Sequence, residues 1–388
     1  MSKTHIIGGL KVKICHTFVE AQADWSALEI NCDGSIYQTF IWCETWFACA
    51  GLQSDIQPLI IVLLNNDDVP LLILPLQIRN KFGQKLLEWL AQSENNYGFG
   101  LFGSPTDGLQ YDIWFENNFA LLNEALPKYD VVNLQNMPTR LFDRLHPLLF
   151  LSENAAANSS YIFALNRSFD ELIRSKRTVQ SISKINRRDQ RLSEIGELKF
   201  EVFENGDQGA KILEECIEHK RQQLAMRGIQ HALSPLQLEF FVALLENNAK
   251  SAVKLVVFQL SINGRTISSA IGGVYNSSFS LMILSMAPDA PLALSPGDMT
   301  LRNTISWACE QNLTLYDLSN GEADYKLVWA DEQISLFNCF KARSLKGLPL
   351  AAALMALHFV KRILKRNHLF YGAFDGMRRR LFGRAHQS

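Results

Sequence analysis

Three apolar runs follow one another in the second half of the chain, at 253–261, 266–275 and 279–287. They are rich in β-branched and aromatic residues, and the connections ING and NSS suit tight turns. The runs therefore predict three consecutive antiparallel strands. Two predicted helices precede them, at about 209–227 and 235–248, and a helix at 298–311 and a strand at 313–319 follow. Further upstream, the apolar spacing of 168–195 predicts one long amphipathic helix.

The length of 388 residues suggests two domains. No short sequence repeat is visible, but the first half also contains a predicted hairpin, at 58–64 and 70–78, and a later strand and helix. The small polar stretch 152–160 is typical of a linker. We therefore expect an α/β (α+β) protein with domains at 1–165 and 166–346 and a tail at 347–388.

The overall charge argues against DNA as a partner, because the formal net charge is only −1. The charge is uneven: residues 341–388 contain eleven Lys or Arg and one acid, so this tail is +10 and the rest is −11. The seven cysteines are scattered and form no C-x-x-C pair, so neither a metal site nor a disulfide framework is expected. No signal peptide or spanning apolar run is evident, and we expect a cytoplasmic, soluble protein.

Two segments of the second half suggest binding or chemistry. In 294-LSPGDMTLRNTISWACE-310, a helix N-terminus behind Ser-Pro-Gly would suit a phosphate, although Asp298 could simply be the N-cap. In 319-SNGEADYKLVWADE-332, a tyrosine that can transfer a proton and a lysine that can bind an oxyanion stand beside apolar residues. An ordinary solvated turn is the alternative for this segment.

Two basic stretches each fit two interpretations. The segment 174–191 carries seven Lys or Arg, which suit the solvated face of a helix or a cradle for an anionic carrier such as tRNA. The tail combines an apolar run with many positive charges. It suits either a helix on an anionic membrane surface or a helix docked on the protein itself.

With these elements in order, the chain resembles the GNAT (Gcn5-related N-acetyltransferase) superfamily, in particular its CelD-like, cellulose-biosynthesis-type branch, which is related to the FemAB peptidyltransferases. In the first half the residues that carry the resemblance are 25-WSAL-28, 38-QTFIWCETW-46 and 74-LPL-76. In the second half they are 174-RSKRTVQSISKINRRDQRL-192, 216-CIEHKRQQLAMRG-228, 295-SPGDMTL-301 and 321-GEADYKLVWADE-332.

The resemblance implies two tandem GNAT-like domains, each a mixed, mostly antiparallel sheet flanked by helices, with a degenerate first domain and the acyl-donor site in the second. Tyr325 would be the general acid, Lys326 would assist, and Asp317 or Asp324 would deprotonate the acceptor. Lys220, Gln223 and Arg227 would face the acceptor. The donor-binding residues would be Ser285, Met286, Ala287, Ser295, Gly297, Asp298, Met299 and Thr300.

The function implied is transfer of an acyl group from acyl-CoA (acetyl-CoA) or an acyl-carrier thioester to an amine or hydroxyl of an envelope polysaccharide, lipid or small molecule. Ser-Pro-Gly replaces the family's usual Q/R-x-x-G-x-G/A loop, so the donor stays open. The alternatives are a transferase that uses aminoacyl-tRNA and a non-catalytic subunit of a polysaccharide synthase. The tail would hold the protein at the inner face of the cytoplasmic membrane, or on a membrane synthase.

Overall fold

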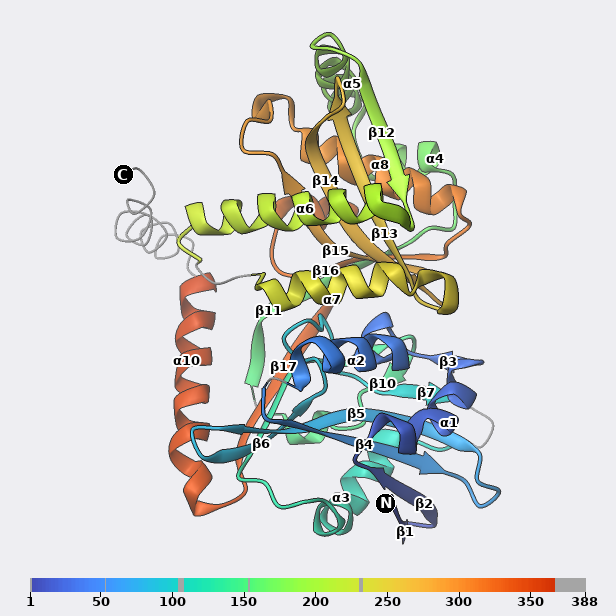
Figure 1. The fold of residues 1–388 in the computed structure, drawn as a ribbon, viewed down its shortest axis with the longest axis vertical. Helices are drawn as coiled ribbons and strands as arrows, with labels where there is room; N and C mark the ends of the chain where they lie inside the picture. Colours follow the sequence, from blue (N-terminus) through green and yellow to red (C-terminus); the bar gives the residue numbers. More distant parts are fainter. Residues whose placement is uncertain (1, 53, 104–107, 153, 230–232, 367–388) are drawn as a thin grey trace. The chain divides into compact units, whose positions relative to one another are not determined.

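The computed structural model describes residues 2–52, 54–103, 108–152, 154–229 and 233–366 (Figure 1). The chain forms two compact units, the first built from Met1–Ser159 with Ile334–Arg366 and the second from Ser160–Gln333. The predicted domains, by contrast, divide the chain at 165 and 346. The stretch 334–342 belongs to the first unit because β17 (Glu332–Ala342) pairs with β8 (Val131–Pro138) there.

The second unit contains a mixed sheet with the strand order β11-β16-β15-β14-β13-β12. Every pairing in it is antiparallel except that of β15 with β16. The strands are β11 (Asn154–Ala164), β12 (Leu198–Phe203), β13 (Lys254–Ile262), β14 (Arg265–Tyr275), β15 (Ser278–Met286) and β16 (Leu315–Asn320). The three predicted consecutive strands are thus confirmed as β13, β14 and β15.

Turn chemistry explains why these strands form hairpins. Asn263 and Gly264 both have positive φ, as do Asn276 and Ser277. Two consecutive residues with positive φ characterise the two-residue turn whose twist matches that of paired strands, and Asn and Gly tolerate this conformation.

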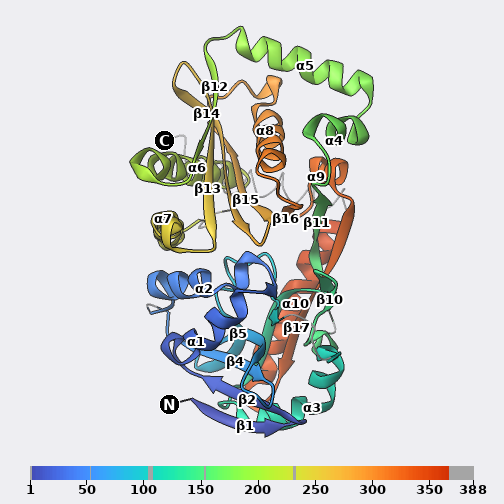
Figure 2. The same cartoon turned by 90° about the vertical axis from the view of Figure 1, so that its right-hand side faces the viewer.

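Helices cover both faces of the second unit's sheet (Figure 2). On one face lie α6 (Gly206–Met226) and α7 (Pro235–Glu246), and on the other lie α8 (Pro296–Glu310) and α4 (Phe169–Lys176). The short α9 (Asp324–Trp329) follows β16. The aromatic core includes Phe163, Phe258, Phe279, Tyr316 and Trp329.

The prediction of one long helix at 168–195 is wrong. The helix is interrupted at Arg177, and a separate helix, α5 (Val179–Ser193), follows. Arg177 is extended, and the hydroxyl of the next residue, Thr178, accepts a hydrogen bond from the Ser181 N–H (3.2 Å). This bond is an N-cap, which favours a new helix start. The expected linker at 152–160 is also wrong, because most of it lies in β11.

The first unit contains a similar sheet, in the order β1-β2-β4-β5-β6-β8-β17, with one parallel pair, β6 with β8. Its remaining strands are β1 (Lys3–Ile7), β2 (Leu10–Cys15), β3 (Cys32–Asp33), β4 (Ile56–Leu64), β5 (Pro70–Lys81), β6 (Gln84–Trp89), β7 (Leu101–Gly103), β9 (Arg140–Leu141) and β10 (Arg144–Leu145). Its helices are α1 (Phe18–Glu29), α2 (Phe40–Trp46), α3 (Tyr111–Ala125) and α10 (Leu348–Arg366). The predicted fold class, α/β with mostly antiparallel sheets flanked by helices, is confirmed.

Candidate active site

The candidate site lies where two parallel strands of the second unit separate. β15 and β16 pair over three positions, from Ser278 with Leu315 to Ser280 with Asp317. β15 continues to Met286 and β16 to Asn320, but in the described structure their ladder stops at Ser280. A register shift against β14 also marks a bulge in β15, which bends a strand. The later part of β15 therefore has an edge on which another extended chain could pair.

Ser285, Met286 and Ala287, predicted to bind the donor, lie at the end of β15. The Ser285 side chain is fully buried, with its hydroxyl 2.9 Å from the Ser269 hydroxyl and 3.3 Å from Cys216 Sγ. Met286 packs in a core cluster that includes Ala287. These side chains are occupied by internal contacts, and the carbonyls of Leu284, Ser285 and Met286 accept hydrogen bonds from side chains of α6 and β14. Donor contacts from this part of β15 would therefore depend on its backbone N–H groups, or on displacement of those side chains.

Lys326 of α9 is buried behind the loop that leaves β16. Its ammonium donates to the carbonyl oxygens of Ser319 (3.1 Å) and Asn320 (2.8 Å). Burial lowers the pKa of Lys326 to about 8, although nearby Asp317 and Glu322 favour the charged form. The lysine is thus enclosed by the loop, and burial makes its ammonium easier to deprotonate than that of an exposed lysine.

The neighbours of Lys326 on α9 have different environments. Asp324 is exposed, whereas Tyr325 is partly buried against the core and burial raises its pKa. Trp329 is fully buried and stacks on Phe163 at a centroid distance of 5.9 Å. Trp329 is therefore a packing residue, and Tyr325 keeps its proton at neutral pH.

Asp317 and a second tyrosine also lie near the loop. The buried Asp317 carboxylate accepts the Ser319 N–H at 2.7 Å. Tyr161 of β11 donates its hydroxyl to Glu322, and burial, reinforced by this carboxylate, raises the pKa of Tyr161. Sequence reasoning missed Tyr161 because it lies 161 positions from Glu322 in a stretch without a motif.

Arginines surround the N-terminus of α8. Asp298, in the first helical turn, contacts the guanidinium groups of Arg177 (3.1 Å), Arg302 (3.2 Å) and Arg188 (3.8 Å). Arg302 also pairs with Asp189 at 2.7 Å. Three guanidinium groups thus face two carboxylates, and the excess positive charge adds to the positive end of the helix dipole. The sequence identified the basic segment 174–191, but it did not show that two of its arginines meet Arg302 at Asp298.

The predicted phosphate-binding residues lie at this N-terminus. Ser295 is the N-cap, with a left-handed φ of 54°, so Asp298 is not the N-cap. The Ser295 hydroxyl accepts from Arg188 at 2.8 Å. The Thr300 hydroxyl is buried and donates to the Pro296 carbonyl (3.1 Å), while Gly297 and Met299 lie in the same first turns. The N–H groups of Asp298 and Met299 both donate to the Ser295 carbonyl (3.0 and 3.3 Å), so an anion at this N-terminus would depend mainly on the arginines.

Lys220 and Gln223 of α6 reach β15. Lys220 Nζ donates to the Leu284 carbonyl (2.9 Å) and Gln223 Nε2 to the Met286 carbonyl (2.9 Å). Burial lowers the pKa of Lys220, and Arg227, the exposed C-cap of α6, acts in the same direction. The structure therefore brings Lys220 and Gln223 to the end of β15 predicted to bind the donor.

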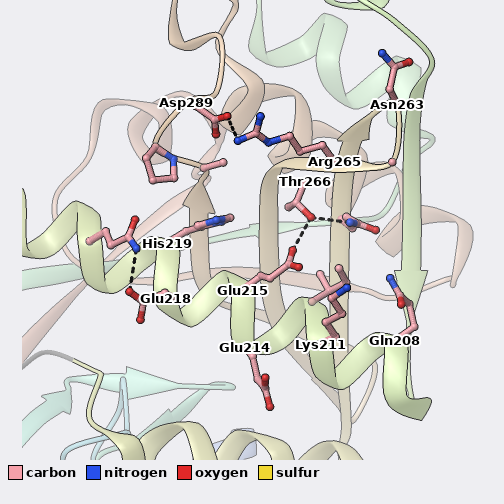
Figure 3. Close-up of a pocket in the computed structure, with 16 residues that line it drawn as sticks. Gln208, Lys211, Glu214, Glu215, Glu218, His219, Asn263, Arg265, Thr266 and Asp289 are labelled. Atoms are coloured by element: carbon pink, nitrogen blue, oxygen red, sulfur yellow. Dashed lines mark hydrogen bonds and ion pairs between the residues drawn. The ribbon is translucent and has the colours of Figure 1, made fainter.

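A groove of about 920 Å³ lies between α6 and the β13–β14 turn (Figure 3). Its four acidic side chains outnumber Lys211 and Arg265, and they are Glu214, Glu215, Glu218 and Asp289. Of the predicted site residues, only Ala287 lines it. Within the part of the chain that the structure describes, no cluster of three His, Cys, Asp or Glu residues could hold a metal ion.

Comparison with known proteins supports the fold of the second unit. Residues 180–327 match a family described as an acetyltransferase (GNAT) domain. The crystal structure of FemX is similar with a TM-score of 0.55 at 13% identity, covering 88% of this chain and 99% of that one. No curated protein matches the chain.

Two further solved structures align less well. L-PGS from Bacillus licheniformis gives a TM-score of 0.49 at 11% identity over 87% of this chain and 100% of that one. A tandem GNAT protein from the clavulanic acid biosynthesis pathway gives a TM-score of 0.46 at 7% identity, covering 86% of this chain and 99% of that one. The CelD-like branch stays a prediction. The second unit, through residues 180–327, carries a domain with the GNAT acetyltransferase fold.

Proposed function

We propose that the protein is an acyltransferase that moves an acyl group from a CoA or acyl-carrier thioester to an amine or hydroxyl. The acceptor class that we propose is an envelope polysaccharide, a lipid or a small molecule. The observation that carries the proposal is the edge of β15 beyond Ser280, which leads to an α8 N-terminus surrounded by Arg177, Arg188 and Arg302. A donor with an extended amide arm and a pyrophosphate needs such a pair of features.

Asp298 is central to donor binding in this proposal. Its carboxylate contacts all three arginines. A donor phosphate would therefore have to share these arginines with Asp298 or displace its carboxylate from them. Arginine binds phosphate in two-pronged geometry and keeps its charge at every relevant pH, so the same side chains can exchange one anion for another. We therefore expect Asp298→Asn to free positive charge and strengthen donor binding.

The proposed chemistry is direct transfer without a covalent enzyme intermediate. The acceptor nitrogen or oxygen attacks the thioester carbonyl, giving its proton to Asp317 or Asp324. The carbon–sulfur bond then breaks, and the leaving thiolate takes a proton from Tyr325. Tyr325 is protonated at neutral pH and so has a proton to give, while burial raises its pKa and makes it a weaker acid than an exposed tyrosine. The Lys326 ammonium is the candidate for stabilising the oxyanion.

A second candidate donor is aminoacyl-tRNA. Lys184, Arg187 and Arg191 of α5 are exposed on the helix that also supplies Arg188. A row of exposed cations suits a nucleic-acid backbone.

A thermal-shift panel tests these functions. The natural chain is measured with CoA, acetyl-CoA, a loaded acyl carrier protein and charged tRNA. A ligand at about 100 times its Kd stabilises by about 2.7 kcal/mol, which is a measurable shift. Stabilisation by CoA species supports the main proposal, stabilisation by tRNA alone supports the alternative, and no response to any donor supports a non-catalytic subunit.

Matched variants locate the binding. Arg188→Ala should remove most of the shift with CoA, whereas Arg187→Ala, the exposed neighbour, should keep it. Equal shifts for both variants would place the donor away from α8.

Once a substrate is found, Tyr325→Phe should lower kcat about 100-fold if this tyrosine is the general acid. Unchanged turnover would remove Tyr325 from that role.

A further inference from the structure

Helix α10 is attached to the first unit along one side. Ala351 is buried in a small cluster with Leu86 and Val131, and Leu354 packs against that cluster. One turn further on, His358 contacts the Ala155 carbonyl with Nε2 at 3.0 Å. Residues three and four apart lie on one face of a helix, so these contacts define the inner face of α10.

The rest of the helix surface is apolar and open to solvent. Leu357 is 69% exposed, Phe359 62% and Val360 52%. The other large exposed apolar residues of the helix are Leu348, Met355 and Ile363. At about 100° per residue these positions cover more than half of the circumference. From Leu348 to Val360 the helix has no Lys, Arg, Asp or Glu.

The width of this face argues for a lipid surface over a partner helix. A coiled-coil seam uses two of every seven positions and is bordered by charged residues that select the partner. Here nearly every outward position is apolar, so a pairing helix would leave much of the face in water. A lipid surface can cover such a face along its whole width.

The charge pattern selects the kind of lipid. The helix ends in Lys361, Arg362, Lys365 and Arg366, and it contains no acidic residue. The sequence that follows to Ser388 has four arginines and one acid, Asp375. Basic residues beside an apolar helix are attracted to anionic headgroups. In the described part of the chain, no helix is long and apolar enough to cross a bilayer.

We infer that the outward face of α10 docks on the surface of a bilayer that contains anionic phospholipid. The helix lies along the membrane, inserting Leu357, Phe359 and their neighbours among the acyl chains, while its inner face stays attached to the first unit. This attachment would hold the protein at a membrane independently of its catalytic chemistry.

Co-sedimentation of the full chain with vesicles tests the inference. One set of vesicles is phosphatidylcholine alone, and the other contains equal parts of phosphatidylcholine and phosphatidylglycerol. The double variant Leu357→Glu/Phe359→Glu places charges at two exposed positions of α10. The matched control is Ile113→Glu/Leu121→Glu, at exposed positions on α3 of the same unit.

We expect the natural chain and the control to bind the anionic vesicles and to bind phosphatidylcholine poorly. Each glutamate on α10 should weaken binding about tenfold or more, so the double variant should lose about 100-fold. Equal binding by the double variant, or no binding by the natural chain, overturns the inference. Gel filtration gives a further way to overturn the inference. If the natural chain is a dimer that binds no vesicles, and the double variant is a monomer, the outward face of α10 pairs with a second copy of the chain instead.

Discussion

Replacing Lys326 with methionine should change how the stability of the protein depends on pH. The lysine is 6% exposed, and its ammonium donates to two loop carbonyls. Burial lowers its pKa from the ordinary 10.5 to about 8. Methionine has nearly the same length and no charge, so the substitution removes the titration while keeping most of the volume.

The magnitude follows from proton linkage. Between about pH 8 and about pH 10.5 the unfolded chain holds the lysine proton while the folded chain has released it, so stability rises with pH in this window. One pKa unit corresponds to about 1.4 kcal/mol. From about pH 7 to about pH 9.5 the natural chain should therefore gain about 2 kcal/mol relative to Lys326→Met. The variant also loses two hydrogen bonds, at about 1–3 kcal/mol each. This loss lowers its free energy of unfolding by the same amount at every pH, so it does not change the slope of the plot against pH.

Urea unfolding, followed by tryptophan fluorescence at several pH values, measures this difference. Other titrating groups are present in both proteins, so they cancel when one curve is subtracted from the other. Lys184→Met, at an exposed position of α5, is the control for replacing a lysine with methionine. Parallel curves for the natural chain and Lys326→Met would refute the reasoning, because Lys326 would then titrate alike in both states.

Three further predictions concern single side chains. Burial lowers the pKa of His146 to about 4, so from about pH 6.5 down to about pH 5 the natural chain should lose about 2 kcal/mol more than His146→Gln in urea unfolding; equal losses would contradict this. Trp329→Ala should destabilise by about 3–5 kcal/mol, visible as a lower urea midpoint, because its ring is fully buried. Thr178→Ala should cost about 1 kcal/mol by removing the N-cap of α5, whereas Thr178→Ser should restore it; no loss in thermal unfolding would mean that the cap is dispensable.

Secondary structure was predicted best where a local signal was strong. The hairpins at β13–β15 and β4–β5 were found because turn residues and apolar runs act within a few positions. The break at Arg177 was missed because the apolar spacing continues through it and hides the cap at Thr178. The linker expected at 152–160 is strand because its partner, β16, lies far along the chain.

The sequence predicted which segments of the chain contribute to the candidate site, but it did not predict which side chains contact each other there. The sequence indicated that Lys326 and Tyr325 stand beside polar residues, but it could not show that Lys326 is enclosed by carbonyls while Asp324 is exposed. Lys220 and Gln223 were predicted to face an acceptor, which stays a prediction, and only the structure shows that both side chains donate to carbonyls of β15.

By itself the sequence determined the hairpins of β13–β15 and β4–β5 and the basic end of the chain, because periodicity, turn residues and charge are local properties. Only the tertiary structure decided which side chains meet. Arg177 and Asp298 are 121 positions apart, and their contact depends on a helix break and on packing of α8 against the sheet. The same holds for Lys326, because its lowered pKa comes from burial, which arises only when the whole unit folds.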